Sequence, residues 1–136
     1  DAASFINPIN GKHVRIEHWR TAHQQGISAA KNMLGQNEKF AGIPFFWTEQ
    51  AGLQIQYIGH AQNWEDSVTV GSIEDKNFIR YYIEDGKVAA AAGIRREKEL
   101  GAVEELLRMD MMPPPDKLNE FKPLEALNTI NLNYKQ

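Results

Sequence analysis

Apolar residues recur at steps of three and four between residues 16 and 34, and this spacing predicts the longest helix of the chain. Gly35 follows the helix and suits a left-handed cap. One side of the helix carries small residues such as Gly26 and Ala30, so another backbone or a flat ligand can approach it closely. The stripe runs through Ile16, Trp19, Ala22, His23, Gly26, Ile27, Ala30, Met33 and Leu34.

Five shorter runs have the pattern of β-strands, and a second amphipathic helix is predicted over residues 96–109. In one of the runs Leu53, Ile55 and Tyr57 alternate with polar residues, and the turn Asp85-Gly86 separates the last two runs. We expect an α+β fold, with an antiparallel sheet of about five strands and helices packed on one face. The strand runs cover residues 45–47, 53–58, 67–71, 77–83 and 87–94.

The spacing of these elements divides the chain into three parts, 1–36, 37–112 and 113–136. Residues 1–14 are expected to form a loop with a turn at Asn10-Gly11. The long helix is expected to belong structurally to another domain. The three prolines that start at Pro113 end any helix, and the tail beyond them has poor periodicity, so it either docks on the body or stays apart from it.

Composition and charge limit the classes of protein to which the chain can belong. The chain has 136 residues, 42% hydrophobic and 24% charged, as in an ordinary globular domain. The net charge of −3 argues against a basic nucleic-acid-binding module, and the lack of cysteine excludes a thiol nucleophile or a cysteine-held iron–sulfur cluster on this chain. Since no apolar run approaches the roughly 20 residues that cross a bilayer, we expect a cytoplasmic protein without membrane or nucleic-acid partners.

Common catalytic and metal-binding patterns do not occur in the sequence. His18 and His23 are five residues apart, so they do not share a helix face as metal ligands would. No nucleophile elbow, dinucleotide fingerprint or phosphate-binding loop is found, and Glu104 and Glu105 are expected on a solvated helix face. We therefore assign no catalytic residue and no metal site.

Two clusters of aromatic and polar residues are the strongest candidates for a binding site. Glu17-His18-Trp19 lies at the start of the long helix, where the partial positive charge favours an electron-rich ligand. The run from Phe45 to Gln50 contains Trp47, and tryptophans beside a helix N-terminus can flank a flat ring. The alternative is that Trp19 and Trp47 are simply core residues.

These clusters belong to a longer pattern of residues. It comprises Arg15-Ile16-Glu17-His18-Trp19, Gln25-Gly26, Asn32-Met33-Leu34-Gly35, Pro44-Phe45-Phe46-Trp47-Thr48-Glu49-Gln50 and Leu53-Gln54-Ile55-Gln56-Tyr57-Ile58-Gly59. The pattern resembles the C-terminal part of FAD-dependent ferredoxin reductases and apoptosis-inducing-factor-like proteins, in the pyridine nucleotide-disulfide oxidoreductase superfamily. Thr48-Glu49 stands where many relatives have Ser-Asp. The resemblance covers residues 1 to about 94 and is not found in the tail.

The resemblance implies an enzyme of three domains in which FAD accepts a hydride from NAD(P)H and passes electrons to a ferredoxin or Rieske-type iron–sulfur partner. Residues 1–36 would be the last segment of the FAD-binding domain, and residues 37–112 the C-terminal domain. The implied FAD-binding residues are Asp1, His18, Trp19 and Trp47. The residues implied to face the nicotinamide are Glu17 and Gln56.

Two hypotheses follow for the chain itself. In the first, it is a fragment that supplies one wall of the flavin and nicotinamide site, is inactive alone, and needs the remaining FAD and NAD(P)H domains. The first residue is Asp1 and not methionine, which also favours the end of a longer protein. In the second, it is a non-catalytic domain that forms a homodimer or docks an electron-transfer partner.

Overall fold

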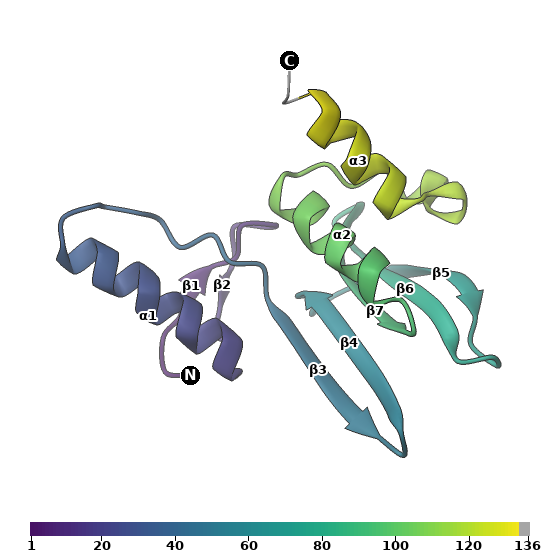
Figure 1. The fold of residues 1–136 in the computed structure, drawn as a ribbon, viewed down its shortest axis with the longest axis horizontal. Coiled ribbons are helices and arrows are strands. Elements are labelled where there is room, and N and C mark those ends of the chain that lie inside the picture. The colour runs from purple at the N-terminus through teal and green to yellow at the C-terminus, as the bar shows by residue number, and fades with distance from the viewer. Residues whose placement is uncertain (134–136) are drawn as a thin grey trace.

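Five antiparallel strands form the central sheet of the computed structural model, which describes residues 1–133. The order across the sheet is β3-β4-β7-β6-β5, so β3 and β5 form its two edges. Figure 1 shows α1 and a small hairpin on one side of the molecule, with the sheet, α2 and α3 on the other. The strands are β3 (Phe45–Gln50), β4 (Leu53–Gly59), β5 (Asp66–Ser72), β6 (Asn77–Glu84) and β7 (Lys87–Ile94).

One face of the sheet carries the core. Ile58 and Tyr81 both lie opposite Ala91 in the register, so their side chains point to the same face. Helix α2 (Glu97–Arg108) packs on this face against β4 and β7, and α3 (Pro123–Asn133) packs on α2. Burial at the centre raises the pKa of Tyr81 to about 12. The expected α+β fold, with helices on one face of a five-stranded sheet, is confirmed.

The tail beyond the prolines docks on the body. It forms a short 3₁₀ helix, η1 (Pro115–Glu120), which contacts β5, and then α3. Leu118 of η1 is fully buried in the same core cluster as Tyr81. Of the two alternatives left open by the sequence, the docked tail is therefore the correct one for the described residues.

The long helix, α1 (Trp19–Met33), begins three residues later than its periodicity predicts. The difference arises because His18 has extended backbone and caps the helix, accepting a hydrogen bond at Nδ1 from the backbone N–H of Arg20 (3.4 Å). Gly35 adopts φ +85°, as expected for a left-handed cap. Within α1 only Thr21 is buried, whereas Trp19, Ile27 and Met33 of the predicted stripe are exposed.

The expectation that residues 1–14 form only a loop is wrong in part. β1 (Phe5–Ile6) and β2 (His13–Val14) pair as an antiparallel hairpin, and the turn between them covers residues 8–10, slightly before the expected Asn10-Gly11. Phe5 is buried and lies edge-on to Phe40, with ring centroids 4.9 Å apart. Strands of two residues are too short to show an alternating pattern, which is why the sequence does not predict them.

An ion pair joins this hairpin to the sheet. Lys12 Nζ lies 2.8 Å from Oε1 of Glu84, whose side chain is almost fully buried. The other carboxylate oxygen of Glu84 accepts hydrogen bonds from the backbone N–H groups of Gln62 (3.0 Å) and Asn63 (3.4 Å). The ammonium of Lys12, followed by these N–H groups, lowers the pKa of Glu84.

We expect this carboxylate to make stability depend on pH. Since the pKa of Glu84 is lowered by folding, its stabilisation is present above the ordinary value of 4.5 and is lost as the pH falls through the lower value in the folded chain. Glu84→Gln should therefore melt at a lower temperature than the wild type at neutral pH, and the difference should shrink below pH 4.5. Thermal denaturation across this range measures it.

Asp85→Asn is the matched control, because Asp85 also lies near Lys12 (3.4 Å) but its side chain is largely exposed. It should change the melting temperature little at any pH. A Glu84→Gln difference that stays constant on acidification would show that the Lys12–Glu84 pair is not what holds the hairpin.

None of the helices within residues 1–133 is both long enough and apolar enough to span a membrane.

Candidate functional site

Three aromatic side chains meet at the N-terminal end of α1. The ring centroid of Trp47 lies 5.3 Å from that of His18 and 5.8 Å from that of Trp19, at steep angles of 72° and 85°. Trp19 and His18 are 5.8 Å apart. The two aromatic clusters of the sequence, which are far apart along the chain, therefore form one aromatic cluster of His18, Trp19 and Trp47.

This aromatic cluster is open to solvent. Trp19 is 64% exposed and Trp47 is 38% exposed, so neither is the core residue that the alternative interpretation requires. The cluster also surrounds the start of a helix, where unpaired N–H groups and the macrodipole give a partial positive charge. Exposed rings beside such a charge suit a flat, electron-rich ligand that covers them.

Arg20 of α1 contacts both β3 and α2. The Cζ atom of Arg20 lies 4.4 Å from the centroid of the Phe45 ring, and Phe45 in turn lies 5.8 Å from Trp47. Arg20 Nη2 donates a hydrogen bond of 2.7 Å to Glu104 Oε1 on α2. The expectation that Glu104 lies on a solvated helix face is wrong, because its side chain is only 18% exposed.

A cavity of about 410 Å³ adjoins the aromatic cluster. It lies between the segment before α1, which contributes Glu17 and His18, and the ends of β3 and β4. Its volume is near the lower end of pockets that hold small molecules, about 300–1,000 Å³. Its lining comprises Arg15, Ile16, Glu17, His18, Pro44, Phe45, Phe46, Tyr57, Gly59 and His60.

Two charged groups lie at the edge of this cavity, and a histidine lies deeper in its lining. Arg15 and Glu17 form an ion pair of 2.8 Å, and both side chains are largely exposed. Burial lowers the pKa of His60, and the nearby charge of Glu84 opposes this effect. The cavity therefore has an apolar body with a charged rim, and His60 inside it is disposed to stay neutral.

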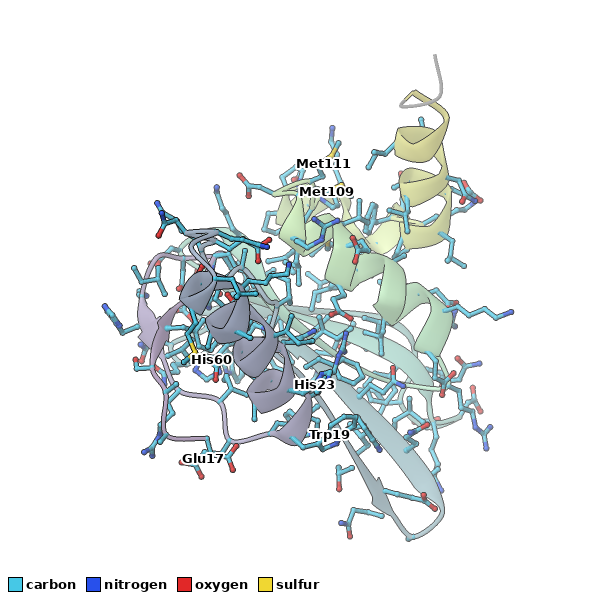
Figure 2. All side chains as sticks on the ribbon, turned by 60° about the vertical axis from the view of Figure 1, so that its left-hand side comes forward. Glu17, Trp19, His23, His60, Met109 and Met111 are labelled. Carbon is cyan, nitrogen blue, oxygen red and sulfur yellow. The ribbon has the colours of Figure 1, made fainter. Side chains whose placement is uncertain are left out.

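The remaining predicted site residues lie in different places. Gln56 is opposite Trp47 in the register of β3 and β4, so their side chains share a sheet face. Glu17 lines the cavity at the start of β3, together with Phe46. Asp1 is exposed at the start of the chain, outside the aromatic cluster. Figure 2 shows Glu17 and Trp19 near the same end of α1, with His23 further along the helix.

No pattern in the sequence singles out Arg20 and Glu104. They are 84 residues apart, and a helical pattern alone places Glu104 on the polar side of its helix. Within residues 1–133, no group of three or more His, Cys, Asp or Glu side chains lies close enough together to hold a metal ion.

Comparison with protein families and curated proteins gives one consistent set of relatives. Residues 45–127 match the family model "Reductase C-terminal". The chain is 33% identical over 110 residues to apoptosis-inducing factor 3 of Homo sapiens, covering 79% of this chain and 18% of that protein. It is also 33% identical over 131 residues to the ferredoxin–NAD(+) reductase component of the anthranilate 1,2-dioxygenase system of Burkholderia cepacia, covering 96% of this chain and 32% of that protein.

Among solved structures, the fold is similar to that in the covalent putidaredoxin reductase–putidaredoxin complex. The TM-score is 0.83 at 22% identity, with 95% of this chain and 31% of that chain covered. The chain thus spans less than a third of the length of these relatives. The family match continues through the prolines to residue 127, so the tail, where the sequence showed no resemblance, is largely part of the matched region.

Proposed function

This chain belongs to the reductase C-terminal family, and from that membership we propose that it is the C-terminal portion of a flavoprotein oxidoreductase. In the full-length protein, electrons would pass from NAD(P)H through FAD to a ferredoxin or Rieske-type iron–sulfur partner. The Burkholderia cepacia relative is a ferredoxin–NAD(+) reductase component, which supports this reaction. The single structural observation that carries the proposal is the open aromatic cluster at the start of α1.

The residues of the aromatic cluster fit the isoalloxazine ring of FAD. His18, Trp19 and Trp47 would lie against the ring, and their exposed surfaces are those that a flat ligand would cover. The N-terminus of α1 would favour the electron-rich edge of the ring. When bound, FAD would supply the chemistry of hydride acceptance and single-electron transfer, which no side chain of this protein can supply.

Other residues have proposed roles around the same ring. Glu17 and Gln56 would face the nicotinamide, and the aromatic body of the cavity beside Glu17 would exclude water from that region. Asp1 would bind the ribityl–phosphate part of FAD, which requires that the preceding domain bring the cofactor to the start of the chain. These residues bind and orient, and none is proposed as a catalytic acid or base.

The domain division is part of the proposal. Residues 1–36 would complete an FAD-binding domain, residues 37–112 would form the C-terminal domain, and residues 113–136 would be the tail. The exposed stripe of α1 supports the first boundary, because Ile27, Met33 and Leu34 have no cover from the sheet domain. An apolar helix face of this kind ordinarily packs against the rest of a domain.

The experiment compares the full-length protein with the 136-residue chain. The full-length protein should carry bound FAD, visible in its absorbance spectrum, and should oxidise NADH or NADPH only when a ferredoxin or Rieske protein accepts the electrons. The 136-residue chain mixed with FAD should show no stoichiometric binding. A full-length protein without flavin would contradict the proposal, and tight binding by the chain alone would contradict its dependence on the other domains.

A second candidate function is dimerisation or partner docking, and one observation favours it. On the sheet face opposite α2, the ring centroids of Phe46 and Tyr57 lie 5.4 Å apart, and Trp64 lies edge-on to Tyr82 at the same distance of 5.4 Å. Phe46 and Trp64 are both substantially exposed. Light scattering on the full-length protein, with and without the iron–sulfur partner, distinguishes this function: a dimer that lacks bound flavin would favour it over the first.

A further inference from the structure

Arg20 lies where three elements of the chain meet. It is the second residue of α1, its guanidinium hydrogen-bonds to Glu104 on α2, and it stacks over Phe45 on β3. The geometry points to Arg20 as a positioning residue that holds the indole of Trp47 against His18 and Trp19. The inference rests on the proposed function only for the identity of the ring that the aromatic cluster receives.

The ion pair between Arg20 and Glu104 differs from an ordinary surface ion pair. The side chains of Arg20 and Glu104 are only 30% and 18% exposed, and the distance between Nη2 and Oε1 is 2.7 Å. Exposed ion pairs contribute little to stability because water and salt screen them, and partial burial reduces this screening. The same guanidinium also lies 4.4 Å from the centroid of Phe45, so one planar group fixes the position of two partners.

The position of β3 needs such a contact. β3 is an edge strand, so its backbone is supported by β4 on one side alone. α1 buries little of its surface, and it contacts the sheet at β3. Because Phe45 precedes Trp47 by two residues, both side chains point to the face on which Arg20 lies. When Arg20 fixes the side chain of Phe45, it therefore also fixes the direction of the Trp47 side chain.

The division of the molecule makes this contact a link between its two parts. Arg20 belongs to the segment proposed to complete the FAD-binding domain, whereas Phe45 and Glu104 belong to the C-terminal domain. Trp19 and His18 come from the first part and Trp47 comes from the second. The aromatic cluster exists only while the two parts keep their relative position, and Arg20 ties them at a point next to it.

The test uses the 136-residue chain and its tryptophan signals. Arg20→Met and Glu104→Gln should each weaken the near-ultraviolet circular dichroism of tryptophan and increase quenching by acrylamide, because Trp47 and Trp19 move apart. Each should lower the folding equilibrium constant about fivefold or more, and the double variant should lose no more than Arg20→Met alone. Arg20→Lys keeps the charge but not the planar stack, so it should restore the signals only in part.

Arg96→Met is the matched control. Arg96 pairs with Glu99 at 3.2 Å, with side chains of similar exposure, but its other hydrogen bond goes to Asn77 of β6 and not to a residue of β3. It should leave the tryptophan dichroism and quenching unchanged. Should Arg20→Met fail to fold, the conservative Glu104→Gln carries the test. Wild-type tryptophan signals in Glu104→Gln, or equal effects of Arg96→Met, would overturn the inference.

A second arm in the full-length protein separates this inference from the proposed function. There, Arg20→Met should change the visible circular dichroism of bound flavin, because a displaced Trp47 would alter the surroundings of the flavin ring. If the tryptophan signals of the chain change but the flavin signal stays that of the wild type, the positioning role of Arg20 stands. The assignment of the flavin site to the aromatic cluster is then wrong. If neither changes, Arg20 has no positioning role.

Discussion

Leu118→Ala is expected to lower the free energy of unfolding of the 136-residue chain by about 2–5 kcal/mol. Leu118 is fully buried, in one core cluster with Tyr81 and Val103. Its removal loses the transfer free energy of the side chain and leaves a cavity between η1 and the sheet, which the surrounding side chains can fill only partly. Urea denaturation followed by far-ultraviolet circular dichroism measures the loss.

Leu124→Ala is the control for this prediction. Leu124 belongs to the same tail, at the start of α3, but is 41% exposed. Its replacement should cost about 1 kcal/mol or less, because less apolar surface returns to water. Equal and small effects at both positions would mean that the tail is not part of the cooperative core, and that the fold ends at α2.

The tail shows why part of the fold could not be predicted from the sequence. η1 is six residues long, which is too short for a periodic apolar pattern, and its one core residue looks like an isolated leucine. Longer patterns predict their elements correctly, as in the helix over residues 96–109 and the strand in which Leu53, Ile55 and Tyr57 alternate with polar residues. Residues 48–50 of β3 were missed because an edge strand needs no apolar side chains once β4 supplies its hydrogen bonds.

The site was predictable in its residue types but not in its contacts. A histidine and a tryptophan at a helix start, with a second tryptophan on a strand, indicated ring-binding chemistry, and the structure brings His18, Trp19 and Trp47 together. The pairing of Arg20 with Glu104 depends on how α1 and α2 approach, which no local pattern encodes. Whether the aromatic cluster holds a flavin stays a prediction, and Trp47 is the residue that tests it most directly.

Trp47→Ala in the full-length protein is expected to raise the Kd for FAD roughly tenfold, a loss of about 1.4 kcal/mol. One aromatic contact contributes about 0.5–1.5 kcal/mol beyond its buried area, and Trp47 would contribute both terms. NAD(P)H-driven reduction of the iron–sulfur partner should fall in proportion to the flavin that is lost. Fluorescence of released flavin during dialysis measures the first effect, and steady-state turnover measures the second.

Trp64→Ala provides the comparison, because Trp64 is also an exposed tryptophan of the sheet domain but lies edge-on to Tyr82 on the opposite face. It removes the same side chain from a place that the proposed flavin does not reach, so flavin affinity should stay close to wild type. Trp47→Phe keeps a ring in contact with His18 and should lie between the two. Equal losses in Trp47→Ala and Trp64→Ala would indicate general destabilisation of the domain, whereas wild-type flavin binding in Trp47→Ala would remove Trp47 from the site.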